Sequence, residues 1–255
     1  MNTQKGHFGR CSRNARHAET VPLALCGLLA LGILHGCGRA IPMMQAVLEP
    51  DYSLVSSVER EDLELAAQIL TSRSRDTGTY ATFRVTDHSQ IVASVLGPHP
   101  TEFFEGGGTA IGLVEFVDLG NAPIELGTTI ATDFEHGYQP EADGIKRHTV
   151  LTNREIDSAF ATGDTPGEYV VEFTLTPDGK SILADYTTEH INSFLGVVVD
   201  KAIISAPRVI SPITDGKAAV AGLTKDEAVQ LAMLTNTEGP LPIPLALKSF
   251  TIPSE

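Results

Sequence analysis

An uninterrupted apolar run at residues 21–34 separates a short basic start from the rest of the chain. Basic residues precede the run and the small residues 36–38 follow it, which is the order of a secretory signal. A buried core helix is disfavoured because the run contains Pro22 and two glycines, which weaken a helix. The run is shorter than the roughly 20 residues that cross a bilayer, although extended through Gly38 it would just span one. The folded part is therefore expected after this segment, outside the cytoplasm.

The end of the run, Leu34-His35-Gly36-Cys37, resembles the lipobox of bacterial lipoproteins. In that family a peptidase cuts before the cysteine, whose thiol carries a diacylglyceryl group. His35 departs from the small residue that is common there. The resemblance makes Cys37 the expected lipid-attachment residue and residues 1–37 a signal peptide with lipobox. The protein is then a lipid-anchored lipoprotein of the cell membrane that faces the extracytoplasmic side; an uncleaved anchor and a plain secreted form are the alternatives.

Cysteines are confined to the N-terminal end, at Cys11, Cys26 and Cys37. The part that follows Cys37 therefore has no internal disulfide, no cysteine-based zinc site and no thiol nucleophile. Trp is absent, so its core must be built mainly from Val, Ile, Leu and Ala.

The net charge of -14 is unevenly distributed. The first 36 residues carry +3, so the remainder carries -17. An acidic mature protein argues against a nucleic-acid partner, because binding to phosphates needs a basic face.

The prolines and weak periodicity of residues 38–55 predict a tether. A first lobe follows at residues 56–149. Ser56 and Glu59 have capping-box spacing and predict a helix that starts at Ser56, with Leu63, Ala66, Ala67 and Leu70 on one face. Further elements are expected as strands at 80–85, 90–96 and 111–119 and a short helix within 101–110. Residues 120–149 are rich in Gly, Pro and charge, and are expected to connect this lobe to the next one.

A second lobe is expected at residues 150–255. It begins with a short helix or capped turn at 151–161. The pattern then predicts strands at 169–176, 195–199, 202–205, 218–221 and 245–252, with helices after Thr176 and from Thr224. Asp215-Gly216 indicates a hairpin turn and Thr224 to Glu227 a capping box. The order β-α-β-β-α-β is that of a ferredoxin-like unit, so the fold class is α+β in two lobes, with a smaller α+β first lobe.

Motifs that carry chemistry are weak. The glycine-rich segment 105–109 lacks the Lys-Ser/Thr of a phosphate loop, so a flexible loop is favoured. Asp133, Glu135, His136 and His148 lie in a segment with no regular spacing, so solvated loop residues are favoured over metal ligands. No G-x-S-x-G or H-E-x-x-H sequence is present. We therefore expect no catalytic residues, no metal and no cofactor.

Residues 169–245 resemble the head of the first periplasmic domain of SecD, the accessory subunit of the bacterial protein-export machinery. Matching segments follow in order at 171–175, 178–179, 186–188, 195–200, 203–207, 212–216, 219–222, 227–228, 231–232 and 239–245. The first lobe resembles the base of that domain more faintly, at 70–78, 91–98 and 113–116. Lys201 stands after Asp200 where the family usually has Gly, so that turn is expected to be of another type.

The resemblance implies a stand-alone SecD-like polypeptide-binding module for protein translocation, since no membrane helices follow residue 245 in this sequence. Its implied partners are unfolded or emerging polypeptide, the Sec translocon and a separate membrane subunit. The alternative is an enzyme or ligand-binding lipoprotein with a site between the two lobes. A deep polar pocket with convergent charges favours the alternative, and a shallow apolar groove on the head favours polypeptide binding.

Overall fold

The computed structural model describes residues 43–97, 100–136, 144–163 and 168–251. Residues Ala40–Glu255 form one compact unit. Two parts of this unit are distinguished below by their sheets. The predicted signal and lipobox at 1–37 lie outside the described residues. In the described part of the chain, no helix has the length and apolarity that crossing a membrane requires.

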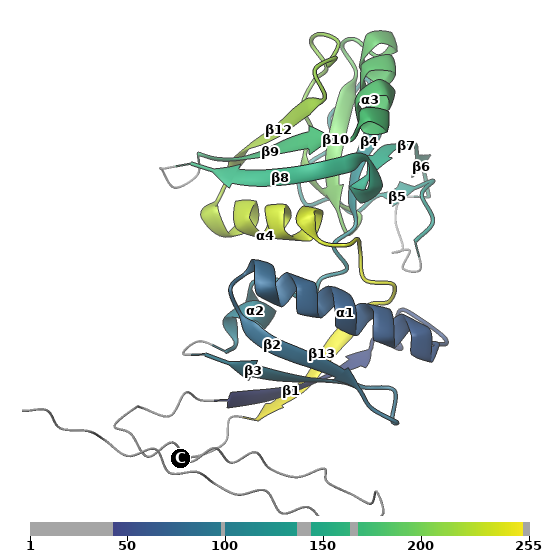
Figure 1. Ribbon diagram of the computed structural model, residues 1–255. Coiled ribbons are helices and arrows are strands. Elements are labelled where there is room, and N and C mark those ends of the chain that lie inside the picture. Colours follow the sequence, from purple (N-terminus) through teal and green to yellow (C-terminus); the bar gives the residue numbers. More distant parts are fainter. Residues whose placement is uncertain (1–42, 98–99, 137–143, 164–167, 252–255) are drawn as a thin grey trace, which may run out of the picture. The chain divides into compact units, whose positions relative to one another are not determined.

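The part that we call the base is one antiparallel sheet with a helix over one face (Figure 1). Its sheet has the strand order β13-β1-β3-β2. The elements are β1 (Met43–Pro50), α1 (Arg60–Asp76), β2 (Tyr80–Val85), β3 (Ile91–Leu96), the short helix α2 (Glu102–Glu105) and β13 (Leu245–Thr251).

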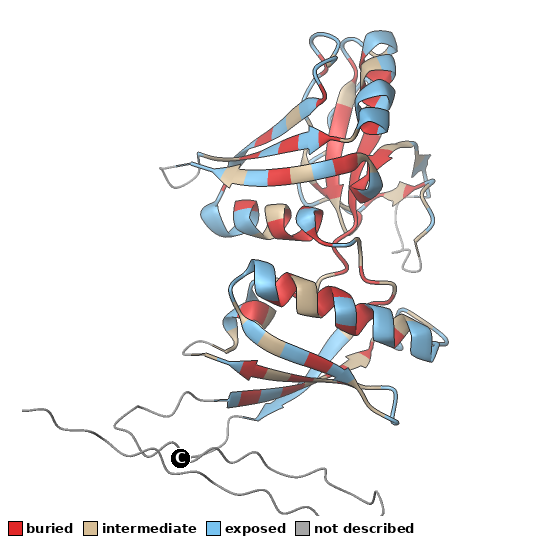
Figure 2. Cartoon of the chain, in the orientation of Figure 1, coloured by how far each residue is buried: buried red, intermediate tan, exposed pale blue. Residues whose placement is uncertain are grey.

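Alternation along the strands places the core of the base between the sheet and α1. Met44, Ala46 and Leu48 of β1 are buried and pack with the stripe of α1 that includes Leu63 and Leu70. Figure 2 shows this burial concentrated between helix and sheet. The helix begins later than its predicted start at Ser56. Glu59 is its N-cap, and Asp62 Oδ2 accepts a hydrogen bond from the Glu59 N–H at 3.2 Å, so the capping box lies three residues further on.

The part that we call the head, residues 114–236, contains two main sheets, ordered β11-β10-β4-β7 and β12-β9-β8, and a short pair β5-β6. Its strands are β4 (Val114–Gly120), β5 (Ala131–Thr132), β6 (Lys146–Arg147), β7 (Thr149–Thr152), β8 (Ile156–Thr162), β9 (Tyr169–Leu175), β10 (Phe194–Val199), β11 (Ala202–Ser205) and β12 (Lys217–Leu223). Its helical elements are the 3-10 turn η1 (Asn153–Glu155), α3 (Pro177–Glu189) and α4 (Lys225–Asn236).

The core of the head is the one that the sequence predicts. Alternate residues of β9 from Val171 to Leu175 are buried, and so is the central run of β10. The buried face of α4, made by Ala228, Leu231 and Leu234, is confirmed as well, and the first two of these residues belong to the same core cluster as β9 and β10. Thr224 and Glu227 form the predicted capping box at the start of α4.

The fold class α+β is confirmed, but the strands do not form the single sheet of a ferredoxin-like unit. β9 pairs with β8 and β12, and β10 pairs with β4 and β11. Both edges of each strand are therefore occupied, so β9 and β10 lie in different sheets.

Three segments differ from their predicted places. The predicted tether 38–55 contains β1, which is the second strand of the base sheet. The last strand, expected in the second lobe, is β13 and pairs with β1 in the base. The strand expected at 111–119 is β4, which lies in a head sheet, because its apolar residues pair with β10.

The region 120–149 is not merely a connection, because part of it is folded into the head. Ile130 is buried, and residues 127–130 hydrogen-bond to the turn and outer edge of β11. The helix or turn predicted at 151–161 is a short capped turn followed by a strand. Thr152 and Glu155 form its capping box, and β8 then continues the chain.

Candidate functional site

Two connections join base and head: an outgoing connection at residues 106–113 and a returning connection at 237–244. The N–H of Leu241 donates to the carbonyl of Ile111 at 2.7 Å, so the connections are bonded to each other. His136 Nε2 lies 2.8 Å from the carbonyl oxygen of Leu241. The head is therefore attached through a paired, hydrogen-bonded junction.

Arg73, in the last turn of α1, holds the outgoing connection with a fully buried side chain. Its Nη1 donates to the carbonyls of Gly108, at 3.2 Å, and Ala110, and its Nη2 donates to that of Ile111 at 2.7 Å. Burial lowers the pKa of the guanidinium to about 10, while the charge of Asp200 acts in the opposite direction. A buried cation is costly unless hydrogen bonds satisfy it, so these carbonyls fix the connection around Arg73.

Asp200 binds the same connection from the head. The turn between β10 and β11 consists of Asp200 and Lys201, with φ of 49° and 69°, as a type I′ turn requires. Asp200 Oδ1 accepts hydrogen bonds from the N–H groups of Gly112 and Leu113, both at 2.8 Å. Burial raises the pKa of the Asp200 carboxyl, although these two N–H groups and Arg73 favour its charged form.

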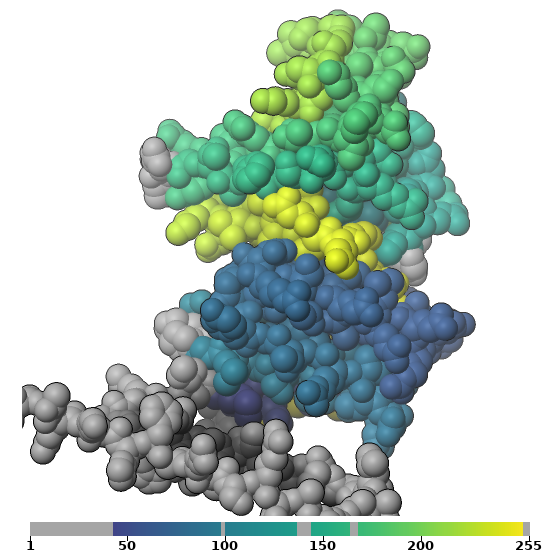
Figure 3. Space-filling view, viewed as in Figure 1, coloured from purple at the N-terminus to yellow at the C-terminus, as the bar shows by residue number. Residues whose placement is uncertain are grey.

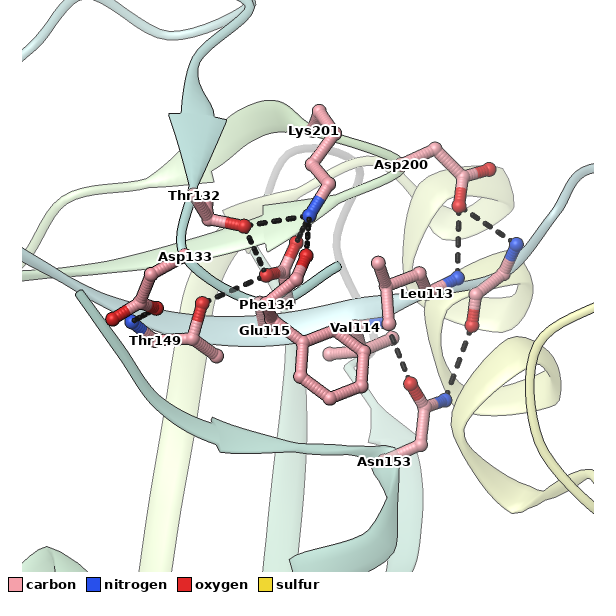
Figure 4. Close-up of polar contacts among 11 residues, drawn as sticks. Leu113, Val114, Glu115, Thr132, Asp133, Phe134, Thr149, Asn153, Asp200 and Lys201 are labelled. Atoms are coloured by element: carbon pink, nitrogen blue, oxygen red, sulfur yellow. Dashed lines mark hydrogen bonds and ion pairs between the residues drawn. The ribbon is translucent and has the colours of Figure 1, made fainter. Parts of the chain in front are cut away.

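Lys201 occupies a separate buried cluster (Figure 4). Its Nζ lies 2.9 Å from Glu115 Oε2, donates to Thr132 Oγ1 at 2.6 Å and donates to the carbonyl of Phe134 at 3.1 Å. The other carboxylate oxygen of Glu115 accepts from Thr132 at 2.7 Å and from Thr149 at 2.9 Å. The cluster attaches residues 132–134 to β4 and to the β10–β11 turn.

Asn153 of η1 completes the polar junction (Figure 4). Its Oδ1 accepts from the N–H of Val114 at 2.7 Å. Its Nδ2 donates to the carbonyls of Gly112 at 3.1 Å and Leu234 at 3.3 Å. One buried amide thus joins the start of β4 to the end of α4.

The four residues weighed as metal ligands do not converge. His148 Nδ1 lies 2.7 Å from Asp133 Oδ2, whereas Glu135 pairs with Lys146 at 3.3 Å. His136 lies against the returning connection. Within the described ranges, no group of three or more His, Cys, Asp or Glu side chains could hold a metal ion.

The other predicted positions also have clear places. Cys37 lies outside the described residues. The glycine-rich segment 106–108 starts the outgoing connection, where the carbonyl of Gly108 accepts from Arg73. Through this hydrogen bond the glycine-rich segment is part of the junction between base and head.

A mainly apolar hollow of about 320 Å³ lies in the head between β11, the end of β12 and α4. Its apolar lining includes Leu126, Val199, Ile203, Ile204, Leu223 and Leu231. Leu126 is 62% exposed and stands at the rim. The backbone of β11 beside the hollow is already paired, since Gly127 N–H donates to Ile203 O at 2.7 Å and Ile203 N–H donates to Thr128 O at 3.0 Å. The hollow therefore offers contacts to side chains rather than a free strand edge.

A second hollow of about 320 Å³ lies beside the two connections, where the alternative function requires a site. The polar groups of Asn153 and His136 in its wall contact neighbouring backbone carbonyls. The guanidinium of Arg154 lies 5.9 Å from the centre of the Phe134 ring. Asn153 and His136 therefore bind the two connections, whereas the Arg154–Phe134 contact lies within the head.

Sequence reasoning did not single out Arg73, Glu115 or Asn153. Two signals were visible: Glu115 is an acidic residue inside the apolar segment 111–119, and Lys201 replaces an expected Gly. The ion pair between them explains both departures.

The comparisons with known proteins agree with this architecture. Residues 131–243 match the family described as SecDF, P1 head subdomain. The protein translocase subunit SecD of Thermobaculum terrenum is 26% identical over 266 residues, which cover 81% of this chain and 51% of that protein. The matched part of this chain is SecD-like. SecD of Dictyoglomus turgidum is 35% identical to the SecD-like chain over 98 residues, which cover 38% of this chain and 24% of that protein. The SecD-like chain thus matches about half, or less, of the length of these relatives.

Two solved structures share the fold of the SecD-like chain. SecDF in its super-membrane-facing form has a TM-score of 0.66 at 24% identity, covering 83% of this chain and 30% of that one. The structure described as a membrane component SecDF that enhances protein export has a TM-score of 0.60 at 22% identity, covering 80% of this chain and 98% of that one. SecD and SecDF are components of protein export and not an enzyme family, in agreement with the expectation from the sequence.

Proposed function

We propose that this SecD-like chain acts in protein export outside the cytoplasm by reversibly binding extended polypeptide in the apolar hollow of its head. The observation that carries the proposal is the apolar lining of that hollow, most of which lies within the residues that match the SecDF head. A role in protein export is also supported by the similar structure that is described as a membrane component enhancing protein export.

The chemistry of the hollow favours apolar side chains of an unfolded segment. Burying such side chains releases about 25 cal/mol per Å² of apolar surface, and folded proteins keep most of theirs inside. A hollow of about 320 Å³ accommodates only a few side chains, so affinity on the order of micromolar is expected. Neither nucleotide nor metal is required for contacts of this kind.

We further propose that Cys37 carries the lipid that tethers the module to the membrane. A thioether-linked diacylglyceryl group provides two acyl chains, which suffice for stable attachment. The partners would be the Sec translocon and a separate membrane subunit. Co-purification of the full chain from membranes, followed by identification of the accompanying proteins, tests this part; the absence of any Sec component would contradict it.

Polypeptide binding is tested by titrating the compact unit Ala40–Glu255 with a permanently unfolded export substrate and with the same substrate folded. Binding to the unfolded form with micromolar affinity, and not to the folded form, is the expected result. Equal binding to both forms, or none to either up to millimolar concentration, would refute polypeptide binding.

A further inference from the structure

One hollow of the described chain lies on the base, along the groove between α1 and the edge strand β2. Its volume is about 720 Å³. Figure 3 shows the outer surface of α1 and its neighbouring strands in blue. The hollow is lined along α1 from Arg60 to Arg75, over which the helix rises about 22 Å. On β2 it is lined by the second half of the strand, Phe83 to Val85, which spans about 10 Å.

Among the described residues, no strand pairs with the outer edge of β2. Within this part of the chain β2 pairs with β3 alone, and the N–H of Thr86 donates to the carbonyl of Gln90 at 2.8 Å where the hairpin closes. In an antiparallel pair, residues alternate between bonding to the partner and facing away from it. Counting back from Thr86, the N–H and C=O groups of Ala81, Phe83 and Val85 therefore face the open edge. Unpaired edge groups of this kind bind a further strand.

The charge of the groove differs from that of the chain. Arg60, Arg75 and Arg84 line it, together with Glu64 and Glu238, in a protein of net charge -14. Arg60 is engaged, with its Nε 2.8 Å from Glu64 Oε1. Arg75 and Arg84 are exposed and have no ion-pair partner among the described residues. Two guanidinium groups and a strand edge that have no partner in the described part of the chain fit an extended segment that carries carboxylates.

We propose that the β2 edge of the base is a second polypeptide-binding site, which takes an extended segment bearing acidic side chains as an added β-strand. That the ligand is a polypeptide rests on the proposed function. The site itself is separate from the head hollow. The floor supplied by Phe83 would contact alternate side chains of the segment, and Arg75 and Arg84 would bind its carboxylates.

The test uses the unit Ala40–Glu255 and a labelled peptide of about ten residues, with alternating Val and Thr and two Glu. Affinity is measured by fluorescence anisotropy. The variant Arg75→Glu/Arg84→Glu should weaken binding at least about tenfold. Lys217→Glu makes the same kind of charge change on an exposed head residue, and it should change affinity less than about twofold. Replacing the two Glu of the peptide by Lys should also weaken binding about tenfold.

Hydrogen exchange of β2 reports on strand addition directly. Peptide should slow exchange of the Phe83 and Val85 amides and leave those of Thr82 and Arg84, which already bond to β3, unchanged. A peptide that is N-methylated at alternate residues should not bind. Leu126→Asp, which alters the head hollow, should leave this protection intact, so the two sites can fail separately.

Three outcomes would overturn the proposal. One is unchanged affinity in Arg75→Glu/Arg84→Glu. Another is protection of Phe83 and Val85 that rises with protein concentration alone, which would show that a second copy occupies the edge. The last is a full chain whose β2 amides are already protected and which excludes the peptide, which would show that its own N-terminal segment is the occupant.

Discussion

Lys201 Nζ lies 2.9 Å from Glu115 Oε2, and the side chains are 1% and 0% exposed. Lys201 adopts a positive φ, which costs an L-residue about 1–2 kcal/mol relative to Gly. The ion pair with the Glu115 carboxylate on β4 offsets this backbone cost, and a Gly at position 201 could not form it. The pair fixes β4 and residues 132–134 to the β10–β11 hairpin.

Removing one member of this pair should destabilise the protein strongly. Lys201→Met leaves the Glu115 carboxylate buried without its cation, and breaking a buried ion pair costs about 3–5 kcal/mol. Urea unfolding followed by circular dichroism measures the loss. The double variant Lys201→Met/Glu115→Leu should recover a large part of it, because no charge is then left buried. A double variant that is less stable than Lys201→Met would contradict this account.

Asp200 should make stability depend on pH. Burial raises the pKa of its carboxyl above the unfolded-state value of about 3.9, so the folded state binds the proton more tightly. This contribution is fully present below the unfolded pKa and is lost as pH rises through the folded pKa. Between about pH 7 and pH 4, the wild type should therefore gain stability relative to Asp200→Asn as pH falls. A stability difference that stays constant with pH would count against this assignment.

A second comparison at Asp200 separates its hydrogen bonds from its charge. Asp200→Asn keeps an oxygen that accepts from the N–H groups of Gly112 and Leu113, whereas Asp200→Ala leaves both without this acceptor. Each unsatisfied buried donor costs about 1–3 kcal/mol, so the alanine variant should be the less stable one at neutral pH. Unfolding of the two variants side by side measures the difference.

Gly112 should tolerate no side chain. Its φ is +81°, and an added Cβ would lie 2.4 Å from Arg73 Nη2, which donates to Ile111. Gly112→Ala therefore combines the left-handed strain of about 1–2 kcal/mol with displacement of Arg73. Gly120 is the matched control, because its φ is +72° and an added Cβ meets nothing within 4 Å. Thermal unfolding should place Gly112→Ala well below Gly120→Ala; equal melting temperatures would show that Arg73 does not require the glycine.

Local features of the chain were predictable where neighbours in sequence decide them. The capping box of Thr224 and Glu227 and the hairpin of β2 and β3 follow from residues a few positions apart. The strand β1 was missed because neither of its partners is close in sequence: β3 follows α1 and β2, and β13 lies near the other end of the described chain. The predicted ferredoxin-like sheet was wrong for the same reason. It requires β9 and β10 to share a sheet, but β8 pairs with β9 and β4 pairs with β10, and these pairings are not visible in the sequences of β9 and β10.

The polar junction could not be predicted from patterns either. In the sequence Arg73 resembles an ordinary cation in the last turn of a helix, where a positive charge interacts favourably with the helix dipole. Its role depends on three carbonyls more than thirty positions away in the sequence. Only the three-dimensional structure brings these groups together.

Cys37→Ala tests the membrane tether. If the thiol of Cys37 carries the lipid, the variant should not be processed at that site, and its mobility on a gel should change. Release from the membrane fraction upon processing elsewhere would agree with the lipid anchor. Unchanged processing together with full membrane retention would favour an uncleaved apolar anchor.

Leu126 tests the head hollow without disturbing the fold. Its side chain is 62% exposed at the rim, so Leu126→Asp should leave the unfolding free energy nearly unchanged while it places a charge where an apolar side chain would be buried. Losing the contact of one leucine corresponds to roughly 1.5 kcal/mol, or about tenfold in affinity for the unfolded substrate. Ile210→Asp is the matched control, because Ile210 is 83% exposed and does not line the hollow. Isothermal titration of both variants should show weaker binding for Leu126→Asp only. An equal loss in both would point to general charge repulsion, and no loss in either would show that the substrate does not enter the hollow.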